Sequence, residues 1–233
     1  MAESEFLELL DWRRRVASMF VEWREASTND AASAASAFRA AKDRLFAEHP
    51  QSPLLPAARD QAEGLAYWTY DAAYRMTVRL EPIEGTIGPH DEEDSTGSTV
   101  GPLSLPSSGP GSIRFRRIGR VRLVGPLAGR TLAVFWIDAY GGGLFLPFRD
   151  ATSGRETYGA GRYLLDTIKS ADHGGDMAMD SLLLDFNLAF HPSCAYDPRW
   201  VCPLAPRENT LDVAVPAGER LSVPVGERVS GSA

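Results

Sequence analysis

The chain has 233 residues, enough for one large or two small domains that each bury a substantial core. Its hydrophobic content of 44% and charged content of 24% are ordinary for a globular protein. The formal net charge of -7 argues against general affinity for nucleic acids or anionic membranes, because both need a positive field on the protein.

The N-terminal sequence lacks the basic start and apolar run of a secretory signal. No apolar stretch reaches the roughly 18 residues that a membrane span requires. With only Cys194 and Cys202, the chain has no disulfide framework. These features predict a cytoplasmic protein without a membrane partner.

Two helices are predicted at the start of the chain. Residues 5–25 carry apolar side chains at steps of three and four, which is typical of an amphipathic helix. Thr28 or Asn29 could cap a second helix, and His49 should end it, because a residue before proline avoids the helical region. We therefore expect an N-terminal helical segment over residues 1–63.

The period of the sequence changes after this segment. Residues 74–80 alternate as a strand does, whereas residues 85–112 are rich in Gly, Ser and Pro and predict a mostly mobile loop that could contain one short strand. Within the loop, the acidic run at 90–94 could hold a divalent cation or could be a solvated loop tip. Further segments with strand character, separated by glycine-rich turns, follow at 113–124, 132–139, 144–148, 163–168 and 181–186.

This order of elements predicts an α+β fold, in which N-terminal helices pack on a mainly antiparallel β-sheet or partly closed β-barrel. We expect residues 64–218 to form a β-rich domain packed with the helical segment, with a loop at 85–112. Residues 219–233 have low complexity and predict a flexible tail. One contiguous domain is favoured over two.

The segment at 113–123 contains five arginines and no acid, and a break in its alternation at Arg117-Ile118 suggests a β-bulge. Such a strand could grip phosphates, or it could be a solvated sheet face whose charge is balanced by acidic loops. The net negative charge of the chain favours the second interpretation, so no nucleic-acid partner is expected. The arginines are Arg114, Arg116, Arg117, Arg120 and Arg122.

Residues 149–162 are the densest polar stretch of the chain. Arg149 and Arg162 carry planar guanidinium groups that could hold a carboxylate or phosphate. Asp150, Glu156 and Tyr158 are candidate acid or base groups if burial shifts their pKa. A purely structural turn, with side chains capping backbone amides, explains the same residues equally well.

His191, Cys194 and Cys202 could hold zinc, but the spacing of the cysteines does not fit the usual zinc motifs. A disulfide or a redox pair is a second alternative, and two buried structural thiols a third, which we favour. We expect no metal and no cofactor. Elbow, HExxH and phosphate-loop motifs are absent from the sequence, which disfavours the enzyme classes that depend on them.

The stretches LPFRDATSGRETYGAGRYL and LDFN.AF.P.CAYDPRWVCPL.P.EN.L.VAV.AGE, where a dot stands for any residue, closely resemble the bacterial family catalogued as domain of unknown function 1684. AAKDRLFAEHPQSPL and GLAYW are similar to the N-terminal pattern of the family. One departure is His191, where the family more usually has asparagine. The family implies no established activity, and its motif residues carried onto this sequence are Arg149, Asp150, Thr152, Gly154, Glu156, Tyr158, Gly161, Arg162, Asp185, Asn187, Cys194, Tyr196, Cys202 and Asn209.

The polar character of these motif residues favours a ligand site over a purely structural motif, because a core is specified by apolar residues. Our first hypothesis is an accessory protein that binds a small anionic molecule. The alternative is a hydrolase or lyase that uses Glu156, Asp150 or Tyr158 for proton transfer. We expect the motif residues of the two polar stretches to converge on one rim of the sheet. The candidate ligand-binding residues are Arg149, Thr152, Arg162, Asp185, Asn187, Cys194, Tyr196 and Asn209.

Overall fold

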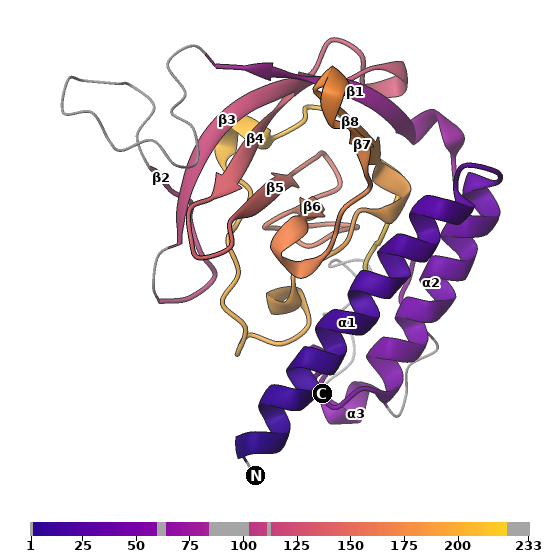
Figure 1. The fold of residues 1–233 in the computed structure, drawn as a ribbon, viewed down its shortest axis with the longest axis vertical. Coiled ribbons are helices and arrows are strands. Elements are labelled where there is room, and N and C mark those ends of the chain that lie inside the picture. The colour runs from indigo at the N-terminus through magenta and orange to yellow at the C-terminus, as the bar shows by residue number, and fades with distance from the viewer. Residues whose placement is uncertain (1, 60–63, 84–102, 111–112, 223–233) are drawn as a thin grey trace, which may run out of the picture.

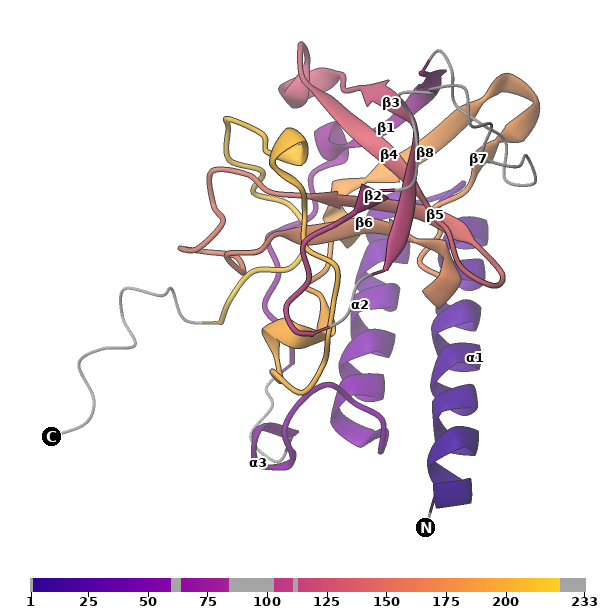
Figure 2. The ribbon, with the colours of Figure 1, turned by 90° about the vertical axis from the view of Figure 1, so that its left-hand side faces the viewer.

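A computed structural model describes residues 2–59, 64–83, 103–110 and 113–222. Two long helices open the chain, α1 (Ala2–Ala26) and α2 (Ala31–Glu48), and a short helix α3 (Pro56–Arg59) follows them. The two long helices lie side by side along one side of a curled sheet (Figures 1 and 2). The acidic run at 90–94 lies outside the described residues.

Helix α2 begins after Asp30 rather than after Thr28 or Asn29. The Asp30 carboxylate accepts hydrogen bonds from the backbone N–H groups of Ala32 and Ser33, which the first turn leaves without helical partners. The expected cap was therefore wrong by one or two residues. The helix ends as predicted at His49, whose extended backbone precedes proline.

The strands form one antiparallel sheet in the order β6-β5-β4-β3-β1-β8-β7, with β2 paired to β3. The sheet curls into a half-barrel, which confirms the predicted α+β fold class (Figure 1). Its strands are β1 (Arg75–Pro82), β2 (Leu103–Ser104), β3 (Arg114–Arg122), β4 (Thr131–Ile137), β5 (Gly143–Phe148), β6 (Arg162–Asp166), β7 (Gly175–Asp176) and β8 (Ser181–Asp185).

Every segment predicted to be a strand is one. The bulge is also confirmed, because the register between β3 and β4 shifts between Arg117 and Gly119. The two-residue strand β2 lies in the predicted loop at 85–112, which could contain one short strand. The two-residue strand β7 lies in a segment that we expected to be a turn, since two residues are too few to show alternation.

The described side chains bury three cores, and the two larger ones lie inside the half-barrel and against the helices. One fills the inside of the half-barrel with residues such as Val121, Val134, Leu146 and Phe148, each with no exposed surface. The other lies between the helices and the sheet, where Phe20, Trp23 and Phe38 pack with residues of β8 and the segments beside it. Among the described helices, none combines the length and the apolar character that crossing a membrane requires.

The chain after β8 crosses the molecule and contacts both layers. Its backbone bonds to Arg149 through Asn209 and Leu211, and to Ala66 through Arg220. Glu219, the first residue of the expected flexible tail, is only 1% exposed and donates its backbone N–H to Ala189. This returning segment supplies a charged side chain to the interior.

Candidate functional site

Arg162, at the start of β6, lies in the interior with 1% exposure. One terminal nitrogen donates to the carbonyls of Ala217 and Glu219. The other donates to Asp150 Oδ2 and to the Val215 carbonyl, at 2.9 Å each. Internal acceptors therefore occupy the guanidinium fork that we expected to hold an anion.

Asp150 and Thr152 form the turn that receives Arg162. Asp150 Oδ1 accepts the Thr152 N–H at 3.0 Å and also the Thr152 hydroxyl, while Asp150 Oδ2 accepts the Val215 N–H at 2.9 Å. Both residues are buried. The arrangement is that of a turn whose side chains cap backbone amides, and it pairs a buried arginine with a fully bonded carboxylate.

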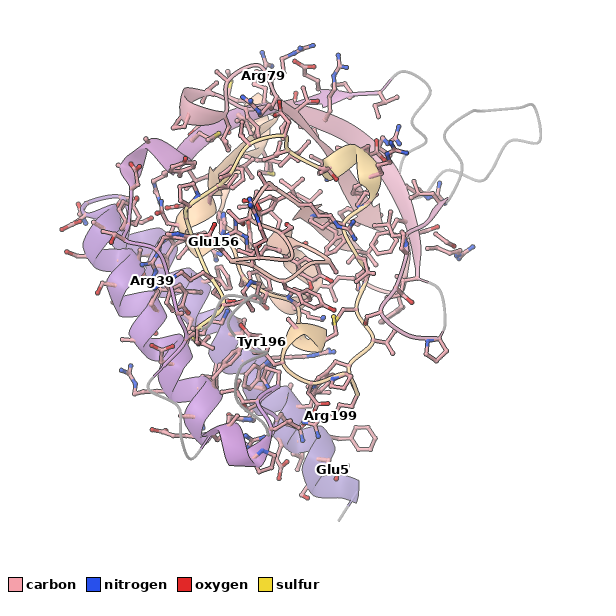
Figure 3. All side chains as sticks on the ribbon, turned by 180° about the vertical axis from the view of Figure 1, so that it is seen from behind. Glu5, Arg39, Arg79, Glu156, Tyr196 and Arg199 are labelled. Carbon is pink, nitrogen blue, oxygen red and sulfur yellow. The ribbon has the colours of Figure 1, made fainter. Side chains whose placement is uncertain are left out.

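The other acid–base candidates of this stretch lie elsewhere. Glu156 is exposed (Figure 3). Tyr158 lies with its hydroxyl 3.8 Å from the sulfur of Cys194, and burial, followed by that thiol, raises the pKa of Tyr158 to about 12. Arg149 is half-buried, and its Nε has no hydrogen-bond partner among the described residues.

Asp185 and Asn187 belong to a second network at the end of β8. Asp185 Oδ1 accepts both the backbone and the side-chain N–H of Asn187 at 2.9 Å, and Asp185 Oδ2 lies 3.2 Å from Arg75. The Asn187 amide in turn bonds the backbone of Asp71 in both directions. Arg39 of α2 donates to the carbonyl of Asn187 at 2.9 Å.

The predicted convergence is therefore incomplete. Arg162 bonds to Asp150, whereas Asp185 and Asn187 bond to Arg75, Asp71 and Arg39, and Glu156 points to solvent. Each network fastens backbone segments together. Asn209 does the same elsewhere, because its side-chain amide bonds the backbone of Ala133 and Pro147.

Sequence reasoning missed Glu219, which is the centre of a buried polar cluster. One carboxylate oxygen bonds to Lys42 of α2. The other accepts the His191 N–H at 2.7 Å and the Tyr196 hydroxyl at 2.8 Å. Although burial raises the pKa of Glu219, the Lys42 ammonium and further donors outweigh it and hold that pKa below its ordinary value. The clues in the sequence were that Glu219 is a lone acid in the apolar stretch VAVPAGE and that this stretch ends the family motif.

His191 lies beside this cluster but is not arranged as a base. Its Nε2 accepts the backbone N–H of Tyr158 at 3.3 Å, and its Nδ1 lies 3.7 Å from Glu219. Burial lowers the pKa of His191 to about 4, against the opposing charge of Glu219. The imidazole is therefore neutral at pH 7, and a backbone amide occupies the nitrogen that would have to take up a proton.

A cavity of about 100 Å³ lies between the helices and the sheet, next to the Glu219 cluster. Figure 3 shows Tyr196, one of its lining residues, on the side of the sheet that faces the helices. Aromatic rings from both layers form most of its wall, and Lys42, His191, Ser193, Asp166 and Lys169 add polar groups. The rings belong to Trp12, Phe20, Phe38, Phe46, Tyr163, Phe190 and Tyr196.

Asp166, the last residue of β6, is the unusual member of this wall. It is 4% exposed, and its Oδ1 is buried without a hydrogen-bond partner among the described residues. Its Oδ2 lies 3.6 Å from the ammonium of Lys169. Burial raises the pKa of Asp166, because Lys169 only partly offsets the loss of hydration.

Four of the five arginines of β3 pair with acids, in line with the second interpretation, and Arg116 pairs with Asp138 at 3.4 Å. Arg120 and Arg122 both pair with Glu81 of β1, at 2.9 and 2.6 Å. Arg117 pairs with Glu208 at 2.6 Å. Among the residues described, no three His, Cys, Asp or Glu side chains gather as a metal site, and Cys194 and Cys202 are free thiols.

The family model described as protein of unknown function (DUF1684) matches residues 60–220. The chain belongs to this family. The resemblance stated from the sequence motifs is thus confirmed, although its description as bacterial is not supported. A solution NMR structure of an uncharacterized protein from Haloarcula marismortui is similar to this chain, with 33% identity and a TM-score of 0.56. The alignment covers 84% of this chain and 97% of that one. The comparison with curated proteins gives no match.

The residues that line the cavity fall on both sides of the start of the DUF1684 match at residue 60. Asp166, His191 and Tyr196 lie inside the matched residues, whereas the α1 and α2 side chains that complete the wall precede them. The polar groups of the wall other than Lys42 of α2 therefore come from the family region, and much of the aromatic wall comes from the helices.

Proposed function

We propose that this protein binds a small, mainly apolar molecule carrying one hydrogen-bond donor in the cavity between the helices and the sheet. The observation that supports it most is the buried, unpartnered Oδ1 of Asp166 in a wall otherwise rich in aromatic rings. Ligand sites are commonly apolar, with a few polar groups that fix orientation. An unsatisfied buried acceptor calls for a donor, from a ligand or from water.

The size of the cavity limits the ligand. Its volume of about 100 Å³ is comparable to the roughly 150 Å³ of an apolar cavity that accommodates benzene. The occupant is therefore the size of one aromatic ring or a short alkyl chain. A phenol or a small alcohol has the required combination of an apolar body and a hydroxyl donor.

The charges of the wall do not require an anion. Lys42 is paired with Glu219, and Lys169 lies beside Asp166. Because each ammonium faces a carboxylate, a neutral ligand leaves no charge uncompensated. The proposed site for a neutral ligand replaces the expected anion clamp of Arg149 and Arg162, because the Arg162 N–H groups donate to acceptors inside the protein. The enzyme alternative gains no support, because Asp150 is fully bonded and Glu156 is exposed.

The test compares two probes that differ in one hydroxyl, phenol and toluene. NMR titration should show both perturbing signals from α1, α2 and β6, with phenol binding about tenfold more tightly, as one buried hydrogen bond to a carboxylate allows. Asp166→Leu should reduce this preference to near unity. Asp138→Leu is the control, because the Asp138 carboxylate is also largely removed from solvent, pairs with Arg116 at 3.4 Å and does not line the cavity.

A second variant tests the place of binding. Val16 lines the cavity and Val21 is 42% exposed on the same helix. Val16→Phe should abolish binding of both probes by filling the space, whereas Val21→Phe should leave it unchanged. If neither probe perturbs the protein, or if the preference for phenol survives Asp166→Leu, the proposal is wrong and water alone satisfies the carboxylate.

A further inference from the structure

A second cavity, of about 160 Å³, lies between α1 and the loop after β8. Trp200 of that loop forms part of its wall, and we call it the Trp200 cavity. It shares Trp12, Lys169 and Ser193 with the cavity of the proposed function, so the two cavities are neighbours. Their other lining residues differ, which makes the Trp200 cavity a separate space with its own chemistry.

The wall of the Trp200 cavity carries cations, and its described lining residues include no Asp or Glu. The cations are Arg13 of α1 and Lys169. Two carboxylates outside the wall already have partners, because Asp166 lies 3.6 Å from Lys169 and Glu8 accepts the Gln51 amide at 3.1 Å. Arg13 forms no ion pair with any described residue, and the residues three and four positions from it along the helix are all apolar. One positive charge in this wall is therefore uncompensated.

The same wall contains a hydrogen-bond donor without an acceptor. Nε1 of Trp200 is buried and has no hydrogen-bond partner among the described residues. The backbone of Trp200 is fixed, because its N–H donates to the Asp197 carbonyl and its carbonyl accepts the Ser108 hydroxyl, both at 3.2 Å. The Arg199 guanidinium lies 5.2 Å from the centre of the indole ring. A buried donor held in this way costs free energy unless a ligand or water accepts its hydrogen.

The remaining wall suits a small, flat molecule. Leu9, Trp12, Pro53 and Val201 supply apolar surface. The volume of about 160 Å³ is close to the roughly 150 Å³ of an apolar cavity that accommodates benzene. Val201 is 45% exposed and the Lys169 side chain 55% exposed, so this wall reaches the protein surface, where a ligand can enter.

We propose that the Trp200 cavity binds a small carboxylate with a flat apolar body, such as an aromatic acid. The carboxylate accepts the indole N–H of Trp200 and faces the Arg13 guanidinium, while the ring lies against Trp12 and its apolar neighbours. A single negative charge matches the single uncompensated cation. Inorganic phosphate has no apolar group for the rest of the wall.

The unmet requirement here is the opposite of that in the first cavity. There a buried acceptor, the Asp166 carboxylate, lacks a donor, whereas here a buried donor lacks an acceptor. The two cavities therefore select different ligands, and either proposal can fail alone.

The experiment titrates the full-length protein with benzoate and with benzamide, which have nearly the same shape but differ in charge. NMR signals of α1 and of residues 199–202 should move with both, and benzoate should bind about tenfold more tightly, as one charge-assisted contact allows. Inorganic phosphate should not displace it. Arg13→Gln should bring the preference for benzoate close to unity. Arg14→Gln is the matched control, because Arg14 is an exposed arginine of the same helix that does not line the cavity.

A second variant tests the indole donor. Trp200→Phe keeps an aromatic ring but removes the N–H, so binding of both probes should weaken about fivefold, since the benzamide oxygen accepts the same hydrogen. Trp136→Phe is the control, because Trp136 lies in β4 and lines neither cavity.

Two further variants separate the Trp200 cavity from its neighbour. Leu9 lines only the Trp200 cavity, and Val16 lines only the first cavity. Leu9→Trp should abolish benzoate binding and spare phenol binding, and Val16→Phe should do the reverse. The proposal is wrong if benzoate does not bind, if benzamide binds equally well, or if Val16→Phe also abolishes benzoate binding. A protein that binds benzoate in this way but not phenol would overturn only the proposed function.

Discussion

Arg162 shows how a buried charge can serve structure. Its guanidinium lies over the rings of Trp68 and Phe148 at 5.2 and 5.0 Å and joins β6 to the returning C-terminal segment. The family motif predicted that this residue matters, but a motif does not say whether the partners of a side chain are a ligand or the backbone. That distinction depends on contacts 53 to 57 residues away in sequence.

Arg162→Lys should therefore destabilise the protein while keeping its charge. Lysine is a point charge that cannot reproduce the planar fork, so buried carbonyls of Val215, Ala217 or Glu219 lose their donors. We expect a loss of about 2 to 4 kcal/mol in the free energy of unfolding, measured in urea. Carboxylates and phosphates should not restore it.

Arg79→Lys is the control, because Arg79 is exposed on β1 at the rim of the sheet (Figure 3). It should change the free energy of unfolding by no more than about 0.5 kcal/mol. An Arg162→Lys protein as stable as the parent, with weakened anion binding, would return the residue to a ligand site.

His191 gives the protein a predicted sensitivity to acid. Its pKa is about 4 in the folded state and 6.5 in the ordinary state, so protonation favours the unfolded chain. The contribution is fully present above pH 6.5 and is lost as the pH falls through 4. Over that range it amounts to about 3 kcal/mol for one buried histidine.

His191→Asn should reduce this loss, because the asparagine amide takes up no proton between pH 6.5 and pH 4. Asparagine is also the residue that the resemblance to the family places there. The difference in unfolding free energy between the two proteins should be constant above pH 6.5 and should shrink toward lower pH. His173 provides an internal control, because burial lowers the pKa of this histidine to about 3. Its own contribution to the pH dependence of unfolding is the same in the variant and the parent. Parallel pH profiles for the variant and the parent would contradict the assignment.

At the scale of elements, Asn209 fills the place where β4 and β5 part. These strands pair from Phe135 to Ile137 and from Gly143 to Phe145. Beyond that stretch, the Asn209 side chain accepts the Ala133 N–H and donates to the carbonyls of Ala133 and Pro147. One side chain thus replaces sheet hydrogen bonds across the opening.

Asn209→Ala should cost about 3 kcal/mol in the free energy of unfolding, because three buried backbone groups lose their partner together. Hydrogen exchange should show a specific loss of protection at the Ala133 amide. Asn29→Ala, in the exposed turn between α1 and α2, is the matched control and should be nearly neutral. Unchanged protection at Ala133 would show that water or another group takes over the contacts.

Periodicity predicted the main elements because a strand or helix face repeats within a few residues. Alternation was sufficient for β1 and β3, and the three- and four-residue steps were sufficient for α1. The N-cap at Asp30 was misplaced because Thr28, Asn29 and Asp30 are all good capping residues, and only the geometry of the chain selects one.

At the scale of the whole molecule, Lys42 and Glu219 join helix α2 to the returning C-terminal segment across 177 residues of sequence. No local pattern predicts such a pair, which is why the candidate site was placed on the arginines rather than here. The cavity has the same origin, since its wall combines helix residues with β6 and the loop after β8. The polar stretches were predicted from the sequence, but their partners were not.

If the helices and the sheet unfold as one cooperative unit, loss of the Lys42–Glu219 pair should lower the free energy of unfolding of both. Lys42→Met leaves the Glu219 carboxylate buried without its cation and should cost about 3 to 5 kcal/mol. Adding Glu219→Gln removes that charge while keeping an acceptor for the His191 N–H, so the double variant should recover much of the loss. Hydrogen exchange in α2 and in β4 should report the same change, since a single transition releases both. A change confined to α2 would instead indicate a helical segment that unfolds separately from the β-rich domain.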